Sequence, residues 1–433
     1  MTKINNIATV GHERQCPAGY KNCDGYIIPN EWSVVRFSSL FKRLTRKNAE
    51  NNQNVLTISA QQGLVSQMDY YNTLYASENK EGYSLLRKGD FSYNKSYSSD
   101  YAYGAIKRLD AYDSGIVSPL YICFTPQDGI NSDFYLQYFE AGHFNREIYK
   151  IAQEGARNHG LLNVSTEDFF NSSLVFPPLA EQERIVEILM QCDKVIDLHR
   201  DRIKAYESLK KVYLKKLFPE KGESEPQLRF PGFSEQWTSR KLGDVVQIKD
   251  SARVPNSLWT KQGVPYLRSS DLLQNGLNGE LFISKESYDM YALKTGAPEK
   301  GDVLFTSGGK VGISFEKLDD NPLYVQGGAV LYIKTSQSDI LNGSFVNAFF
   351  ETSRMKKYID DTSVGGTIKH FTLMPANAAP ISFPSYAEQQ LIGEFFAHLN
   401  HTITLCRQEL MSWQQKKKFL TQALLSGTIR ADW

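Results

Sequence analysis

The sequence predicts an α+β fold in which two mixed α/β globular domains stand in tandem, each followed by a long α-helix. The two helices are expected to pair as an antiparallel coiled coil with pseudo-two-fold symmetry. Three observations support this fold class. The chain has 433 residues, too many for one ordinary core. Its motifs recur in the same order at a nearly constant offset. An apolar heptad pattern follows the last motif of each copy.

Short motifs that occur twice are the strongest of these observations. Ala180-Glu181-Gln182 recurs as Ala387-Glu388-Gln389. Three further matches lie at offsets between 205 and 212 residues, namely Trp32 with Trp237, Lys88-Gly89-Asp90 with Lys300-Gly301-Asp302, and 131–139 with 342–350. Loop insertions produce such drift in offset, so we predict a true duplication. Segment 69–83 shows no counterpart in 275–289, which indicates a shared scaffold with different surfaces.

A long helix is predicted after each Ala-Glu-Gln motif. Prolines 177 and 178 precede the first helix, and acidic residues in its first turn suit the helix dipole. Apolar residues then alternate at spacings of four and three for about five heptads, which is typical of a coiled-coil seam. Pro219 ends the first helix and Gly427 caps the second. The seam includes Ile185, Leu189, Ile196 and Ile203, and then Ile392, Phe396, Ile403, Leu410 and Trp413.

The globular domains read as mixed α and β. Short β-rich runs, such as 55–59, 120–124, 303–306 and 329–333, alternate with Gly, Asn, Asp and Ser turns. A helix is expected at 132–142, with a copy at 344–360. The expected boundaries are a first domain at 1–177, a first helix at 178–219, a linker at 220–231, a second domain at 232–384 and a second helix at 385–433.

Composition excludes several classes of protein. No run approaches eighteen apolar residues, and the polar start of the chain has no secretory h-region, so we expect a cytoplasmic protein without a membrane span. Five cysteines without a CxxC pair favour reduced thiols and no metal site. The net charge of +1 gives no support to nucleic-acid binding, so any basic surface has to be local.

No catalytic motif is recognisable. Gly308–Gly312 resembles a phosphate loop, but Val311 follows the lysine where the Walker pattern needs Ser or Thr. The single Pro-Pro pair, at 177–178, lacks the preceding Asn or Asp of an adenine methyltransferase loop. We therefore expect a non-catalytic chain, without catalytic residues, metal or cofactor, that acts in recognition or assembly.

Polar loops that mix basic residues with Gly, Ser, Asn and His are the best candidates for DNA contacts. Glycines let the backbone approach a phosphate, while Arg, Asn and Ser can read base edges. Such loops lie at matching positions in both copies, at 154–161 and 363–371, and again after each Lys-Gly-Asp turn. The candidate residues are Lys95, Arg157, Asn158, His159, Arg268, Ser270, Ser307, Lys310, Thr367, Lys369 and His370.

The whole chain resembles the specificity subunit of type I restriction-modification enzymes. The resemblance is carried by PLAEQERI at 178–185, by PSYAEQQLI at 384–392, by Lys-Gly-Asp in each domain, and by FPGFSEQW at 230–237. It implies that each domain is a target recognition domain for one half of a bipartite, asymmetric DNA site. It further implies that the helices form a spacer that docks two methyltransferase subunits, with Glu181, Gln182, Glu388 and Gln389 at the helix starts.

Partner subunits would then supply the chemistry. The resemblance implies restriction/translocase subunits as further partners, and S-adenosylmethionine, ATP and Mg²⁺ bound by the partners, in a complex that acts as a DNA adenine methyltransferase and endonuclease. Two other classes remain open from the residues alone. One is an enzyme with unrecognised motifs, and the other is a coiled-coil scaffold that binds proteins without reading DNA.

Overall fold

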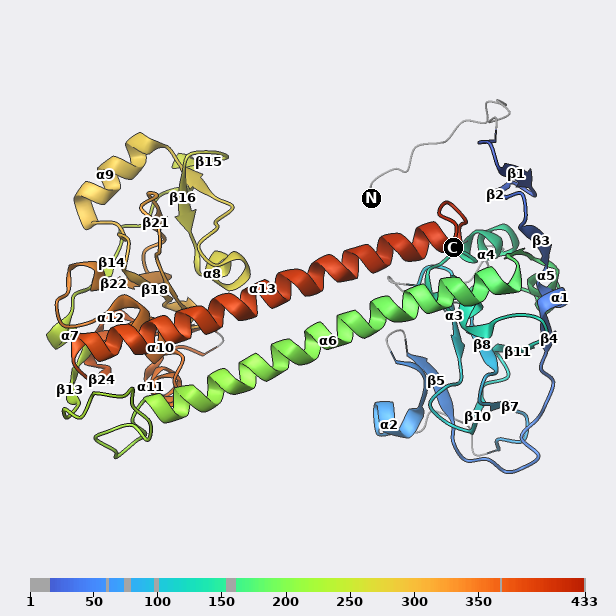
Figure 1. Ribbon diagram of the computed structural model, residues 1–433, viewed down its shortest axis with the longest axis horizontal. Helices are drawn as coiled ribbons and strands as arrows, with labels where there is room; N and C mark the ends of the chain where they lie inside the picture. Colours follow the sequence, from blue (N-terminus) through green and yellow to red (C-terminus); the bar gives the residue numbers. More distant parts are fainter. Residues whose placement is uncertain are drawn as a thin grey trace. The chain divides into compact units, whose positions relative to one another are not determined.

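The computed structural model describes residues 16–59, 62–73, 79–96, 101–152, 161–366 and 368–431. Contacts divide the chain into two compact units, Met1–Asp197 with Met411–Trp433, and Leu198–Leu410. Each unit therefore contains one globular domain together with part of both long helices, α6 (Leu179–Leu217) and α13 (Tyr386–Leu425) (Figure 1). Among the described residues, no helix is both long and apolar enough to span a membrane.

The first domain is built on a four-stranded antiparallel sheet with strand order β4-β11-β8-β9. Its strands are β4 (Phe41–Arg43), β8 (Phe91–Asn94), β9 (Ala105–Arg108) and β11 (Ile122–Pro126). Strands β3 (Ser33–Arg36) and β12 (Ser173–Phe176) form a separate antiparallel pair. The helices are α1 (Phe37–Leu40), α3 (Ser132–Glu140), α4 (Asn145–Ile151) and α5 (Thr166–Asn171).

The second domain repeats this frame with the order β14-β22-β18-β20. These strands are β14 (Ile248–Asp250), β18 (Val303–Thr306), β20 (Ser314–Glu316) and β22 (Val330–Ile333). Strands β13 (Thr238–Lys241) and β24 (Pro380–Phe383) pair as β3 and β12 do. The matching helices are α7 (Leu242–Val245), α10 (Gly343–Phe350), α11 (Ser353–Thr362) and α12 (Leu373–Ala378).

The remaining elements differ between the domains. The first domain has β1 (Tyr20–Cys23), β2 (Tyr26–Pro29), β5 (Leu56–Ser59), β6 (Gly63–Ser66), α2 (Gln67–Tyr71), β7 (Ser84–Arg87) and β10 (Ser114–Val117). The second has β15 (Trp259–Thr260), β16 (Val264–Leu267), α8 (Ser269–Asn275), β17 (Phe282–Ile283), α9 (Lys285–Thr295), β19 (Gly308–Gly309), β21 (Tyr324–Val325), β23 (Lys369–His370) and 3₁₀ turns at Asn256–Leu258 and Thr335–Gln337. The inserted parts thus have their own strand pairings, β15-β17-β16-β21 in the second domain and β5-β6 in the first.

Aromatic side chains form the core of the first domain. The Phe37 ring lies 4.9 Å from the Phe41 and Phe124 rings and 4.8 Å from the Phe169 ring, all four being fully buried. Burying one such side chain contributes about 1.5–3 kcal/mol. This cluster draws together α1, β4, β11 and α5, and so fixes the sheet that carries the loops described below.

The helices α6 and α13 run antiparallel within each unit. In the first unit, Asp193 accepts a hydrogen bond from Lys417 at 2.6 Å, while Glu181, earlier on α6, meets Arg430, later in the chain. In the second unit, the Tyr213 ring lies 5.0 Å from the Phe395 ring, and His199 lies beside Glu409. Every position predicted for the seam is buried or half-buried. The predicted fold class is confirmed.

One predicted helix is wrong in detail. The run 344–360 was expected to form a single helix, but α10 ends at Phe350 and α11 begins at Ser353. Thr352 causes the break, because its extended backbone is the N-cap of α11 and its hydroxyl accepts a hydrogen bond from the Met355 N–H at 3.2 Å. Such a cap competes with continuation of the helix. The spacing of the apolar residues, on which the prediction was based, contains no sign of this competition.

Candidate nucleic-acid interface

Each domain brings two of the predicted polar loops together beside a central strand. In the second domain, β19 follows β18 and pairs with β23, so that Gly308 lies opposite His370 and Gly309 opposite Lys369. In the first domain, Ser96 follows β8 and forms a bridge with Leu161, and the Leu162 N–H donates to the Lys95 carbonyl at 2.9 Å. The same loop pair therefore recurs at the same place on both frames.

In the second domain, a compact turn displays Lys310. The Thr306 hydroxyl donates to the Lys310 carbonyl at 2.7 Å and accepts from the Ile313 N–H at 3.0 Å. Gly309 has φ +81°, which favours glycine. A Cβ at Gly308 would lie 3.3 Å from the His370 ring, so glycine allows β19 and β23 to approach. The Thr306 hydroxyl holds the turn through the Lys310 backbone carbonyl, and the Lys310 side chain is left exposed.

The predicted contact residues of the second domain divide into exposed and supporting groups. Lys310, Lys369 and His370 are exposed, and Lys369 lies 3.3 Å from the Asp360 carboxylate. Ser307 is buried, and its backbone bonds to Ala329 and Phe371 hold the loop pair together from beneath. The structure therefore brings the predicted cations to one surface and places Ser307 below it.

Two other predicted cations are engaged inside their domains. Lys95 donates from Nζ to the Val164 carbonyl at 2.7 Å, and burial lowers its pKa. Arg268 donates from Nε and Nη2 to the Asp271 carboxylate at 3.1 and 2.8 Å, and this hydrogen bonding raises its pKa. The same Asp271 carboxylate accepts from the Arg268 backbone N–H at 2.7 Å at the start of α8, on which Ser270 is exposed. Both cations support loop or helix geometry.

The remaining predicted contacts fall outside the described residues. They are Arg157, Asn158 and His159 in the first domain and Thr367 in the second. Sequence reasoning also missed three cations on α11, namely Arg354, Lys356 and Lys357. Their signal was present, because Met355 and Ile359 recur at helical spacing, which leaves the neighbouring cations on the other faces of the helix.

The Glu-Gln pairs at the helix starts bind their own domains. Gln182 donates to the Pro177 carbonyl at 2.8 Å and accepts from the Asn131 N–H at 3.0 Å. Gln389 makes the same two bonds, to Pro384 and Asn342, both at 3.0 Å. Each glutamine thus ties the start of a long helix to the N-cap asparagine of α3 or α10.

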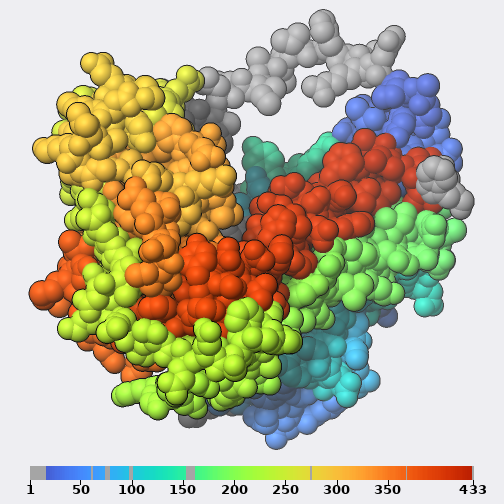
Figure 2. Space-filling model, turned by 60° about the vertical axis from the view of Figure 1, so that its left-hand side comes forward, coloured from blue at the N-terminus to red at the C-terminus, as the bar shows by residue number. Residues whose placement is uncertain are grey.

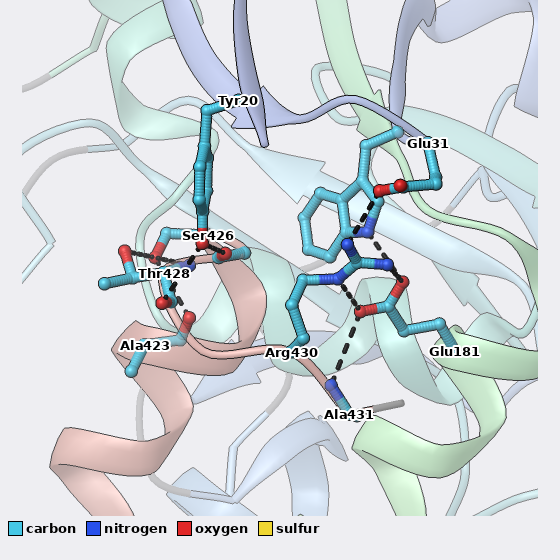
Figure 3. Close-up of polar contacts among 10 residues, drawn as sticks. Tyr20, Glu31, Glu181, Ala423, Ser426, Thr428, Arg430 and Ala431 are labelled. Atoms are coloured by element: carbon cyan, nitrogen blue, oxygen red, sulfur yellow. Dashed lines mark hydrogen bonds and ion pairs between the residues drawn. The ribbon is translucent and has the colours of Figure 1, made fainter. Parts of the chain in front are cut away.

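Each glutamate receives an arginine from the segment that follows the other long helix. Figure 3 shows Arg430, after α13, donating to both oxygens of Glu181 at 2.8 and 3.0 Å and to Glu31 at 2.7 Å. Arg229, after α6, donates to both oxygens of Glu388 at 3.0 and 2.6 Å. We call these two ion pairs the latches. The two arginines stand at different distances from their helix ends, Leu217 and Leu425, so only their shared glutamate partners relate them.

The C-terminal segment closes against the first domain around the Arg430 latch. The Tyr20 hydroxyl donates to the Gly427 carbonyl at 2.9 Å, and the Trp32 indole donates to Glu181 at 2.7 Å (Figure 3). Gly427 has φ +74°, and a Cβ there would lie 2.6 Å from Pro29. Glycine at this position therefore both ends α13 and permits the close packing.

The helices α6 and α13 expose apolar side chains, and Figure 2 shows one face of both helices, drawn in green and red, open at the surface. In the first unit the exposed residues include Met190, Met411 and Phe419, and in the second they include Leu198, Leu209, Val212 and Leu405. Among the described residues, no cluster of three or more His, Cys, Asp or Glu side chains could hold a metal ion.

This geometry defines a class of protein: an internally duplicated chain with two loop-bearing domains latched to a pair of antiparallel helices. Comparison with known proteins gives the family. The model for the type I restriction modification DNA specificity domain matches twice, at residues 29–207 and 234–412. The chain therefore belongs to the type I restriction-modification specificity subunits, and its two domains are DNA specificity domains.

Known relatives agree over the full length. The type I restriction enzyme MjaVIII specificity subunit of Methanocaldococcus jannaschii is 23% identical, over 95% of this chain and 96% of its own. The type I restriction-modification S subunit of M. genitalium has the same fold with a TM-score of 0.55 and 14% identity, over 91% of this chain and 96% of its own. A chain from a structure on complex assembly and conformational transition of the type I R-M system gives a TM-score of 0.56 at 15% identity, covering 93% of this chain and 100% of that one.

Proposed function

We propose that this specificity subunit reads a bipartite, asymmetric DNA site, with one domain for each half-site. The observation that carries the proposal is the recurrence of one loop pair, beside β8 and beside β18, on two frames of identical strand order. Inserted segments of unlike sequence accompany each loop pair, as two different half-sites would require. Loops on a rigid frame are the usual place for such binding residues.

Within each loop pair, the exposed side chains would contact DNA and the buried ones would hold the loops. Lys310, Lys369 and His370 have the required exposure, as does Ser270 on α8, outside the loop pair. Phosphate contacts orient a protein on the duplex, and base-edge contacts give specificity. Arg157, Asn158, His159 and Thr367 belong to the same loops and remain part of the proposed contact surface, while Lys95, Ser307 and Arg268 position it.

The proposal assigns a second role to the helices, which would dock two methyltransferase subunits. Exposed apolar side chains that gather along a helix mark a site of protein–protein interaction. Restriction/translocase subunits would join this assembly, and S-adenosylmethionine, ATP and Mg²⁺ would be bound by the partner subunits. The assembled complex would then methylate adenine or cleave DNA, while this chain contributes recognition.

A protein-binding scaffold without DNA readout is the competing function, because the exposed helix faces would suit it equally. The family match to a DNA specificity domain and the basic, glycine-rich loop pair favour recognition. The two functions differ in one measurable property, since a scaffold would leave the pattern of DNA methylation independent of its domains.

A domain exchange tests the proposal. Residues 1–176 are replaced by the first domain of another specificity subunit, and methylated adenines are mapped in the genome of cells that carry the assembled complex. We expect one half-site to change while the other half-site stays the same. Exchange of 232–384 is the matched control and should change the other half-site. Unchanged sites after both exchanges, or simultaneous change of both half-sites after either, would contradict the proposal.

A further inference from the structure

A basic surface in the second domain consists of α11, the Lys310 turn and β23. The three parts are in direct contact. Gly309 pairs with Lys369, and Lys369 reaches Asp360 of α11 at 3.3 Å. A Cβ at Gly312 would lie 2.7 Å from the Ile359 side chain, so the turn also packs closely on α11. These contacts hold the three parts side by side in the domain.

The exposed face of α11 is rich in cations. Met355 and Ile359, one helical turn apart, are buried in the domain core. Arg354, Lys356 and Lys357 lie on other faces, and both lysines are exposed. Throughout the part of the chain that the structure describes, no ion pair engages these three cations or Lys310. Their charges are therefore available to a ligand.

This surface is more positively charged than the chain as a whole. The protein has a formal net charge of +1. The surface gathers the cations Lys310, Arg354, Lys356, Lys357 and Lys369 against the carboxylates of Asp360 and Asp361. A local excess of positive charge next to a glycine-rich backbone fits a polyanion such as the phosphate backbone of DNA.

We propose that this basic surface binds DNA phosphates and provides the sequence-independent part of the affinity of the second domain. The inference rests on the proposed DNA recognition and adds which side chains contact phosphate. Lys310, Lys356 and Lys357 make the contacts, and Asp360 restrains Lys369 until a phosphate replaces it. His370 and Ser270 are left for the base edges.

The corresponding helix of the first domain provides a useful contrast. On α4, Arg146 donates to the Gly25 carbonyl at 2.8 Å and lies 4.4 Å from the centre of the Tyr26 ring. Lys150 pairs with Glu147 at 2.5 Å. These cations hold the β1–β2 hairpin to α4, so the assignment of phosphate binding is to the second domain alone.

The salt dependence of DNA binding tests the proposal. The full-length chain, assembled with its methyltransferase subunits, is titrated with a labelled random-sequence duplex at several KCl concentrations. Each neutralised phosphate contributes about 0.9 to the slope of log affinity against log salt. The triple variant Lys310→Gln, Lys356→Gln, Lys357→Gln should lower the slope by about 2.7. The control variant Lys261→Gln, Lys285→Gln, Lys294→Gln removes the same charge from exposed positions elsewhere in this domain and should change it little.

A second variant gives the opposite sign. Asp360→Asn removes a carboxylate from the surface and frees Lys369, so affinity should rise severalfold and the slope should steepen by about one contact. The proposal is overturned if the two triple variants lose equal slope, or if Asp360→Asn leaves the slope unchanged. A wild-type complex that binds no duplex at low salt would instead refute the proposed function itself.

Discussion

The two domains share a frame, namely the four-stranded sheet, the separate strand pair and the helices that match between them. The segments inserted into this frame differ between the domains. The frame keeps its strand order, its helix order and its glutamine contacts in both copies. Between β4 and β8 the first domain has a hairpin and α2, whereas between β14 and β18 the second has β15, β16, β17, α8 and α9. The conserved frame concentrates the contacts that join each domain to the helices. The inserted segments differ in their elements, so they can vary without altering the contacts that join each domain to the helices.

The frame itself contains one instructive difference. Glu181 accepts hydrogen bonds from both Arg430 and Trp32, but among the described residues Glu388 is held by Arg229 alone. The matching indole N–H, that of Trp237, is buried without a hydrogen-bond partner in the described structure. Each latch thus has one arginine that donates to both glutamate oxygens, but only Glu181 also accepts from an indole N–H, and this difference can be measured.

The largest expected effect comes from the Arg229 latch. Arg229→Met would leave the fully buried Glu388 carboxylate without a partner, and loss of one member of a buried pair costs about 3–5 kcal/mol. Arg430→Met should cost about 1–3 kcal/mol, because Glu181 retains the Trp32 bond. Urea unfolding with hydrogen exchange at the starts of α6 and α13 measures both losses. Equal losses would show that the Trp32 bond does not support the latch.

Substitution of the two tryptophans should give a smaller difference in stability loss between the domains. This difference has the opposite sign, because here the first domain loses more. Trp32→Phe removes an N–H that donates to a carboxylate, whereas Trp237→Phe removes one with no partner. The first substitution should destabilise the protein by roughly 1.5–3 kcal/mol more than the second, since the lost ring surface is similar. The same unfolding measurement applies, and combining Trp32→Phe with Arg430→Met should cost more than the sum of the two. Equal costs for the two tryptophans would disprove the unequal support of the latches.

The frame was predictable from the sequence because its signals are periodic or repeated. The seam positions follow from the heptads, and Gly427 follows from its place beyond the last apolar residue. Long-range partners were not predictable in this way. Nothing local shows that Lys95 turns toward Val164 or that Arg430 reaches Glu181, because such pairs depend on how distant segments meet. For the same reason, the sequence predicted Ser307 and Lys310 equally as contact residues. The structure distinguishes them, because Ser307 is buried and Lys310 is exposed.

The smallest effect on stability, and the sharpest on specificity, is expected at α2. Met68, Tyr70 and Tyr71 are each 46% exposed there, while Tyr112 holds the helix through hydrogen bonds to Asp69 and the Ser66 N–H. Tyr70→Ala with Tyr71→Ala should change unfolding free energy by only about 0.5 kcal/mol, as exposed substitutions usually do. If α2 belongs to the variable recognition surface, discrimination at the first half-site should fall roughly tenfold, the usual order for a lost base contact.

A short helix in the inserted segment of the second domain, α8, is the control for α2. Both α2 and α8 begin directly after a strand of the inserted segment, β6 or β16, and Leu273 of α8 is 42% exposed. Leu273→Ala should relax the second half-site and leave the first unchanged, in the same methylation-mapping assay. If both variants weakened methylation uniformly at all sites, these helices would serve assembly. The proposed division between a shared frame and an inserted recognition surface would then be wrong.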